Sequence, residues 1–436
     1  MDRGSVSLSS YWRLVRDNRN FRLLWTAQIV SELGDWLYSI AIYSLLLELT
    51  GSAKAVALAV VLQELPQCLA APLSGVVNDR LSRRRIMIAA DLIRAGIVLL
   101  MLLVQSGRWV GLIYALLFLE TTMWAFFEPA RGAVVPNIAH GRDLLAANTL
   151  SSTTWSVTLA VGSALGGVVA VAFGRSTVFL VNALSFLISA SLVRSMRFAE
   201  PHVSASPPLR ARDLVDFTPV LDGVRYVAKD RRRLATLLVK TGLGIMGTSW
   251  VILPVLGARN FPVSAPGLDP PRAAMLGMSL LLGARGVGAL LGPLAGAYWA
   301  GDRNHRMRVG ILCGFLASIA GYLTLGVSGS IWLALAAVVL SHAGGSTVWV
   351  FSTTLLQEQT DDRFRGRVFS ADYALLVLAM SAVTYLAGAL IDHGVTAKSV
   401  AILTGFAGVV PTLAWALALR LWRPSTVPSI PDDGDR

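Results

Sequence analysis

The sequence predicts an all-α membrane protein in which twelve transmembrane helices form two pseudo-symmetric six-helix bundles. Of the 436 residues, 54% are apolar and 15% are charged, whereas about 25% charged is usual in soluble proteins. The apolar residues form twelve blocks of about 20, each long enough to cross about 30 Å of hydrocarbon as a helix. A short motif at the end of the second block also recurs at the end of the eighth. This distribution excludes a soluble enzyme, a secreted domain and a nucleic-acid-binding protein, despite a formal net charge of +12.

Each apolar block must be helical, because lipid offers the backbone no hydrogen-bond partner. The expected spans are 22–48, 55–77, 86–105, 109–130, 145–172, 176–194, 234–257, 273–299, 308–326, 331–355, 367–391 and 398–421. We expect an interfacial arm at 1–21, one bundle at 22–194, a linker at 195–233, the second bundle at 234–421 and a tail at 422–436.

The linker contains a predicted amphipathic helix. Thr218-Pro219 is a good N-cap followed by proline at the first helical position. An apolar stripe then faces away from Arg225 and Lys229, which is typical of a helix that lies on a membrane surface. The arm has a similar mixture of aromatic residues and arginines. Either segment could serve simply as a membrane anchor.

Lysine and arginine orient the spans. The N-terminal arm, the linker, the tail and the loops on their side carry 29 of these residues, and the opposite loops carry six. Since cytoplasmic loops are enriched in such residues, we expect both termini in the cytoplasm of a bacterial cell, with the chain in the inner membrane.

An internal repeat points to a class of function. Pro72-Leu73-Ser74-Gly75 ends the second span, and Pro293-Leu294-Ala295-Gly296 ends the eighth, 221 residues later. A six-plus-six duplication is typical of transporters, which bind substrate between the halves and expose it to each side in turn. We expect the same arrangement here.

Several polar residues lie near the middle of predicted spans, where charges are costly and usually functional. On the first span, spacings of four and three place three of them on one helical face. We expect this set to line a water-accessible cavity for substrate and protons. The candidate cavity residues are Gln28, Glu32, Asp35, Glu64, Glu120, Lys240 and Arg285. The alternative is that Glu32, Glu64 and Glu120 form static ion pairs with Lys240 or Arg285 across the halves.

Glycines at spacings of four mark two spans whose backbones can approach a neighbouring helix closely. We expect the fifth and eighth spans to cross at the boundary between the halves, or their glycines to serve packing inside each half. These glycines are Gly162, Gly166 and Gly167, and Gly288, Gly292 and Gly296.

Other signals are absent from the sequence. No lysine follows a glycine, so there is no phosphate-binding loop, and the histidines lack the spacing of metal ligands. Cys68 and Cys313 both lie in apolar blocks. We therefore expect no cofactor, no metal site and no enzymatic activity. Any transport must be driven by a gradient or be passive.

Nearly the whole chain resembles the major facilitator superfamily. The loop from Gly75 to Arg84 is similar to its signature G-x-x-x-D-R-x-G-R-[RK], with Ser82 in place of the second glycine. The resemblance implies an inner gate in which Asp79 and Arg83 close against the start of the eleventh span. Asp91 and Arg94, three residues apart, are expected to pair with each other or with this gate. The candidate gate residues are Gly75, Asp79, Arg80, Arg83, Arg84, Asp91, Arg94, Arg367 and Asp372.

Within the superfamily, the chain resembles the branch of bacterial macrolide efflux proteins and the enterobactin exporter. The motifs that carry this resemblance include Phe21-Arg22-Leu23-Leu24-Trp25, Phe127-Glu128-Pro129-Ala130 and Arg365-Gly366-Arg367-Val368. The segment from Gly162 to Gly167 is similar to an antiporter element in the fifth span, with Ser163 replacing proline. The fourth-span arginine of many drug–proton antiporters is missing, and Glu120 is the charged residue there.

These observations predict a secondary active transporter that works by alternating access, a proton-coupled exporter of a hydrophobic or cationic small molecule of the drug or siderophore class. The alternatives are a flippase-like carrier of lysophospholipids or other amphiphiles, and a non-transporting membrane sensor with the same fold. The expected partners are a small-molecule substrate, protons and the lipid bilayer, with no nucleic acid, and the chain is expected to be a monomer.

Overall fold

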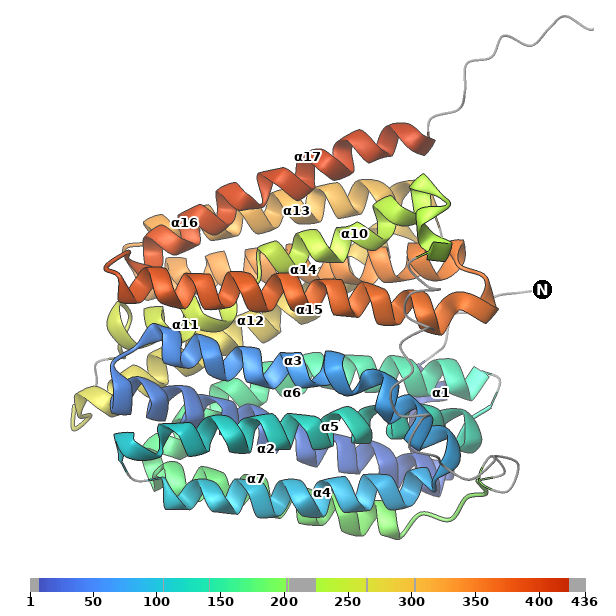
Figure 1. Cartoon of the computed structure of the whole chain (residues 1–436), viewed down its shortest axis with the longest axis horizontal. Coiled ribbons are helices and arrows are strands. Elements are labelled where there is room, and N and C mark those ends of the chain that lie inside the picture. Colours follow the sequence, from blue (N-terminus) through green and yellow to red (C-terminus); the bar gives the residue numbers. More distant parts are fainter. Residues whose placement is uncertain are drawn as a thin grey trace, which may run out of the picture.

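The computed structural model describes residues 8–104, 106–140, 142–200, 203, 225–263, 266–301 and 303–422. Within these residues the regular elements are helices, and the long ones run side by side (Figure 1). Eleven helical segments are long and apolar enough to cross a membrane. The twelfth span is α2 (Arg19–Thr50), whose 32 residues are sufficient in length but include Gln28, Glu32 and Asp35. The expected all-α fold of membrane-spanning helices is confirmed.

The first bundle is preceded by the short helix α1 (Leu8–Asp17), which packs on α2 and α6. Serine side chains cap two of its helices, because Ser52 accepts from Ala55 N at the start of α3 and Ser82 accepts from Arg85 N at the start of α4. Besides α2, the bundle contains α3 (Ala53–Arg80), α4 (Arg83–Leu100), α5 (Val110–Ile138), α6 (Arg142–Phe173) and α7 (Arg175–Arg194).

The second bundle has six spans, two of which are broken. Its helices are α10 (Arg231–Ile245), α11 (Ser249–Arg259), α12 (Pro270–Ala300), α13 (Asn304–Val327), α14 (Ile331–Gln359), α15 (Asp362–Asp392), α16 (Ala397–Ala407) and α17 (Val409–Ala418). The sequence predicts one continuous helix over 234–257, but α10 ends at Ile245 and α11 starts at Ser249. The break lies at Gly247, where a Cβ would be 2.5 Å from Met380 Cγ of α15. A similar break at Gly408 separates α16 from α17.

Parts of the arm, linker and tail lie outside the described residues. These parts are residues 1–7, most of the predicted linker helix after Thr218-Pro219, and the chain beyond Trp422. The described end of the linker is helical from residue 225 to 228 and leads into α10.

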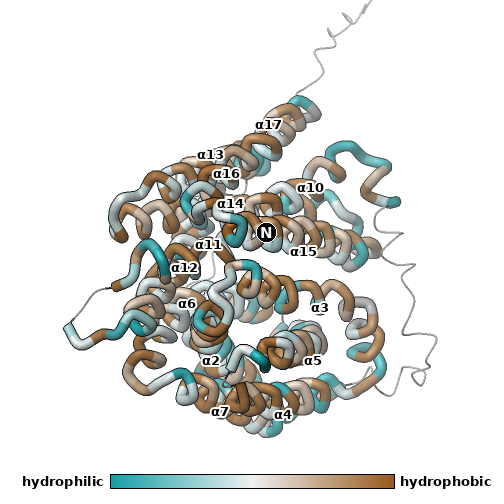
Figure 2. The backbone as a smooth tube through the Cα atoms, turned by 60° about the vertical axis from the view of Figure 1, so that its left-hand side comes forward, coloured by the Kyte–Doolittle hydropathy of each residue, from teal (hydrophilic) through white to brown (hydrophobic). Residues whose placement is uncertain are grey.

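The two bundles pack together through α6 with α12 and through α3 with α15. Helix α1 and the end of α17 lie at the same end of the molecule, on the right in Figure 1. We call this end the tail face. The α2–α3 and α15–α16 connections lie at the other end, which we call the opposite face (Figure 1). Hydrophobic residues extend along the helices, and hydrophilic residues gather in connections and at helix ends (Figure 2).

Candidate functional site

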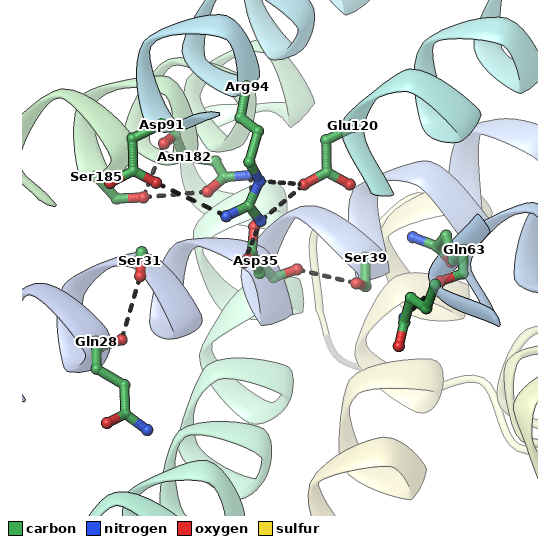
Figure 3. Close-up of polar contacts among 11 residues, drawn as sticks. Gln28, Ser31, Asp35, Ser39, Gln63, Asp91, Arg94, Glu120, Asn182 and Ser185 are labelled. Atoms are coloured by element: carbon green, nitrogen blue, oxygen red, sulfur yellow. Dashed lines mark hydrogen bonds and ion pairs between the residues drawn. The ribbon is translucent and has the colours of Figure 1, made fainter. Parts of the chain in front are cut away.

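The polar face of α2 lies inside the first bundle, where Arg94 of α4 is the centre of an ionic cluster (Figure 3). Arg94 Nη2 lies 2.8 Å from Asp35 Oδ2 and 2.7 Å from Glu120 Oε1. Arg94 Nε also donates to Glu120 Oε1 at 2.8 Å. Asp91 Oδ1, one turn earlier on α4, lies 3.9 Å from Arg94 Nη1. We call Asp35, Asp91, Arg94 and Glu120 the Arg94 cluster; it joins α2, α4 and α5.

The Arg94 cluster is buried except on one side. Arg94, Asp91 and Glu120 are buried, whereas 27% of the Asp35 side chain is accessible. Asn182 of α7 donates through Nδ2 to Asp35 Oδ1 at 3.4 Å, and the Arg94 guanidinium lies 4.0 Å from the centre of the Phe186 ring. Asp35 is therefore the most exposed member of the Arg94 cluster.

A glycine lets α2 approach α7 closely enough to form this site. A Cβ at Gly34 would lie 2.4 Å from both Asn182 Oδ1 and Ser185 Oγ. Ser185 in turn donates to Asn182 Oδ1 at 3.1 Å, which orients the amide toward Asp35. Gly34 thus permits the close contact between α2 and α7 that places Asn182 beside Asp35.

A second polar network lies one turn nearer the tail face. Gln28 Nε2 donates to Glu32 Oε1 at 2.8 Å, and Thr158 Oγ1 of α6 donates to Glu32 Oε2 at 2.9 Å. Arg131 of α5 donates through Nη1 to Gln28 Oε1 at 2.8 Å and through Nε to Glu128 Oε2 at 2.8 Å. Glu32 is therefore held by hydrogen bonds from both sides, within a network that contains one cation and two carboxyl groups.

The second bundle has its own buried ion pair. Lys240 Nζ of α10 lies 2.6 Å from Asp372 Oδ2 of α15, and both side chains are buried. Lys240 Nζ also lies 4.6 Å from the centre of the Trp349 ring. Asp372, one of the candidate gate residues, therefore has Lys240 as its partner in this structure.

An aromatic stack crosses from one bundle to the other. The rings of Trp36 in α2 and Trp250 in α11 are nearly parallel, with centres 6.1 Å apart. Trp155 of α6 meets Trp36 edge-on at 5.8 Å, and the Arg285 guanidinium lies 3.2 Å from the centre of the Trp250 ring. Glu64 of α3 lies within electrostatic reach of Arg285. These side chains make up a polar and aromatic region between the bundles.

The alternative of static ion pairs across the halves is wrong for Glu120. Glu120 does not pair with Lys240 or Arg285 across the halves, because Arg94 in its own bundle is its partner. Asp91 and Arg94 do pair with each other, as one of the two expectations had it, and the Arg94 guanidinium also points toward Asp35 and Glu120 (Figure 3). Arg94 and Lys240 each pair with a carboxylate on a neighbouring helix of their own bundle.

The other candidate gate residues lie at the tail face. Arg83 Nη2 is 3.7 Å from Asp79 Oδ1, and Arg83 also donates to the backbone oxygens of Asn78 and Ala133 at 3.2 and 3.0 Å. Arg83 therefore ties the α3–α4 turn to the end of α5. Gly75 lies on α3, Arg80 ends α3, Arg84 donates to the backbone oxygen of Arg194, and the Arg367 guanidinium is 5.7 Å from the Phe364 ring centre.

The glycines divide among three packing surfaces. Gly167 of α6 faces α12, where an added Cβ would be 2.0 Å from Ser279 Oγ. Gly162 and Gly166 instead face α2, and the α12 glycines Gly288, Gly292 and Gly296 face α14. Helices α6 and α12 do cross between the bundles, but the crossing on α12 uses Gly283 and Gly286, whose Cβ positions meet Ala164 and Ala160.

A set of contacts that the sequence did not predict joins the bundles at the opposite face. Asp392, at the end of α15, accepts from Ala53 N at 2.7 Å, from Lys54 N at 3.2 Å and from Ser52 Oγ. Its carboxylate therefore caps the N-terminus of α3, where a negative charge is favourable. Arg259 of α11 donates to Gly51 O at 2.6 Å. We call these contacts the opposite-face clasp.

Sequence reasoning also missed Arg131, Glu128, Asn182 and the tryptophans of the stack. The predicted span 109–130 places Arg131 just outside the membrane, but α5 continues to Ile138. The i, i+3 spacing of Glu128 and Arg131 could have indicated an ion pair inside a longer helix. Nothing in the local sequence distinguishes Trp36 and Trp250 from lipid-facing tryptophans.

Comparisons with known proteins agree with this architecture. The family described as transmembrane secretion effector matches residues 10–430. Macrolide efflux protein A of Streptococcus pyogenes is 25% identical, with 85% of this chain and 87% of that protein covered. Tetracycline resistance protein, class C, of Escherichia coli is 26% identical over 83% and 85%. The nucleoside transporter NupG has the same fold, with a TM-score of 0.70 over 91% of this chain and 99% of that chain at 11% identity. Since one family model spans almost the whole chain, the protein belongs to the transmembrane secretion effector family of major facilitator transporters.

Proposed function

We propose that this membrane transporter exports a hydrophobic or cationic small molecule in exchange for protons, by alternating access. The observation that carries the proposal is the Arg94 cluster, in which three carboxyl groups surround one guanidinium inside the first bundle. Buried charge is costly unless it is balanced. The cluster reaches neutrality when two of the three carboxyl groups hold protons, and release of a proton leaves a negative charge that a cation can compensate.

Asp35 is the proposed contact between proton and substrate. Its carboxylate belongs to the Arg94 cluster, and its side chain is the accessible member. Trp36 follows it on α2, and Glu32 lies one turn away. A cation bound against aromatic faces beside a carboxylate is favoured by both charge and cation–π attraction. Competition between that cation and a proton at Asp35 would couple their opposite movements.

The packing of the bundles supports a state closed at the opposite face. Ser152, Leu159, Ser163 and Ala170 lie on one face of α6, at spacings of seven, four and seven. The three toward the opposite face are buried, at 1%, 1% and 2% exposed, whereas Ser152 toward the tail face is exposed. Together with the opposite-face clasp, this gradient favours access from the tail face. Alternating access requires a second state in which the clasp is broken and the tail face closes through Asp79 and Arg83.

The orientation follows from charge. The tail face carries most of the lysine and arginine residues, so we place it in the cytoplasm of a bacterial inner membrane. Export is supported by the family description and by the relatives, one named a macrolide efflux protein and one a tetracycline resistance protein. We propose the monomer as the working unit, because both bundles needed for the site lie in one chain.

Transport into inverted vesicles tests the proposal. An imposed proton gradient should drive uptake of a fluorescent lipophilic cation, and collapsing the gradient should abolish it. Asp35→Asn and Glu120→Gln should each reduce gradient-driven uptake about tenfold or more, since each removes a carboxyl group from the Arg94 cluster. Glu48→Gln is the matched control, because Glu48 pairs with Arg175 outside the cluster and its side chain is 48% exposed. Wild-type uptake by both cluster variants, with normal protein abundance, would remove the cluster from the mechanism.

A further inference from the structure

A basic cavity lies on the outer flank of the first bundle at the tail face, away from the residues between the bundles. Its volume is about 730 Å³, and it lies where α3, α4 and α7 end or begin. Among the described residues, its charged lining consists of four arginines, Arg80, Arg84, Arg85 and Arg194, and one carboxylate, Glu200. The described part of the lining therefore has a formal charge of three positive.

Glu200 already accepts hydrogen bonds from within the protein. Glu200 Oε1 accepts from Arg84 N at 3.3 Å, and Glu200 Oε2 accepts from Ser82 Oγ at 2.6 Å. Glu200 thus caps the start of α4. The Arg84 guanidinium donates to the backbone oxygen of Arg194, while Arg84 Nε is buried and lacks a hydrogen-bond partner among the described residues.

Below the cavity, α4 presents an apolar stripe to the surroundings. Arg85, Ala89, Leu92, Gly96 and Leu99 are exposed at spacings of three and four, so they share one face of the helix. The first is the arginine of the cavity, and those that follow toward the middle of the span are small or apolar. The stripe therefore changes from basic to apolar with depth.

Helix α7 packs beside α4 and repeats this pattern in the reverse chain direction. Leu184, Leu187 and Ile188 are exposed, followed by Ser191 and then Arg194 at the tail face. Two adjacent apolar stripes therefore both end at an arginine of the same cavity. Arginines that served only as exposed charges at helix ends would not need to lie in line with apolar stripes on two neighbouring helices.

We propose that this cavity binds the phosphate headgroup of an anionic phospholipid, whose acyl chains lie along the α4 and α7 stripes. Guanidinium groups suit phosphate because they combine charge with several aligned donors. Basic pockets beside transmembrane helices on the cytoplasmic side bind anionic headgroups in this way. A free phosphate ion would use the arginines but would leave the two apolar stripes without a role. The proposal does not depend on the transported substrate.

Native mass spectrometry of the purified full chain tests the site with defined lipids. The wild type should bind dioleoylphosphatidylglycerol more tightly than dioleoylphosphatidylcholine. The double variant Arg85→Gln/Arg194→Gln should bind phosphatidylglycerol about 30-fold more weakly, since each basic residue contributes about 1 kcal/mol near an anionic headgroup. The matched control is Arg303→Gln/Arg306→Gln, which removes two arginines from the corresponding α12–α13 connection and should retain wild-type binding.

A measurement on the unaltered protein guards against misfolding of the variant. Phenylglyoxal should modify Arg85 and Arg194 in phosphatidylcholine vesicles and much less in phosphatidylglycerol vesicles. Millimolar inorganic phosphate should not reproduce this protection. Equal affinity for the two lipids in the wild type, unchanged binding by the double variant, or equal modification in both vesicles would each overturn the proposal. Protection by inorganic phosphate alone would also overturn it, in favour of a site for a free anion.

Discussion

At the scale of single residues, the first bundle depends on the charge balance around Arg94. Its guanidinium contacts Asp35 and Glu120 within 2.8 Å and has Asp91 at 3.9 Å. Removing one partner of a buried pair leaves an uncompensated charge, which typically costs about 3–5 kcal/mol. Arg94 therefore stabilises the fold while it permits three carboxyl groups to remain inside it.

We expect Arg94→Gln to lower the free energy of unfolding by about 3 kcal/mol or more. Adding Glu120→Gln should recover part of this loss, because it removes one of the carboxyl groups left without a cation. The coupling between the two substitutions should be about 1–3 kcal/mol. Thermal unfolding in detergent measures all three variants.

Arg175→Gln is the control for this comparison. Arg175 pairs with Glu48, whose side chain is 48% exposed. Loss of such an exposed pair should cost no more than about 1 kcal/mol. Strictly additive effects of Arg94→Gln and Glu120→Gln would show that the cluster does not act as a unit.

Sequence alone could predict which site residues share a helix but not which helices meet. The spacing of Gln28, Glu32 and Asp35 places them on one face of α2, whatever the fold. Their cation could not be identified, because Arg94 lies 59 residues after Asp35 and close in sequence to the gate motif. Lys240 and Asp372 are 132 residues apart, so tertiary packing alone brings them together.

At the scale of elements, the crossing of α6 and α12 depends on missing side chains. A Cβ at Gly286 would lie 2.4 Å from both Cα and N of Ala160. Backbone atoms cannot move aside as a flexible side chain can, so the two helices would have to separate. This contact also lies on the boundary between the bundles, where small residues permit close approach in lipid.

We expect Gly286→Ala to destabilise the protein by about 1–3 kcal/mol, the usual range for overpacking. Gly96→Ala is the matched control, because Gly96 is also in a helix and has no atom within 4 Å of its Cβ position. That substitution should be neutral or stabilising by up to about 1 kcal/mol. Thermal unfolding of both variants checks the difference. Equal stability of the two would contradict the assigned close packing.

Element positions were largely predictable because span length follows from bilayer thickness. The helix breaks at Gly247 and Gly408 could not be predicted, because glycine is common inside transmembrane helices. These two glycines differ from the others through their contacts with Met380 and Met246, which only the packed structure shows. The glycine pattern indicated that the fifth and eighth spans meet. It did not indicate which glycines face the partner, because that depends on the rotation of each helix.

At the scale of the whole molecule, polar contacts join the two bundles at the opposite face. Asp392 holds the N-terminus of α3 across the boundary, and Arg259 holds Gly51. Both contacts involve helix ends, which can separate without breaking any helix. Rigid rotation of one bundle against the other could therefore open this face while the ionic clusters inside each bundle stay intact.

The most direct test of this account is a distance measurement between spin labels across each face, in a cysteine-free background in lipid. Labels at Arg108→Cys and Arg272→Cys report on the opposite face, and labels at Asn148→Cys and His305→Cys report on the tail face. We predict two populations at each face, which change in opposite directions when pH is lowered or a transported cation is added. Asp392→Asn should favour the state open at the opposite face. One unchanging distance at each face under all conditions would contradict alternating access.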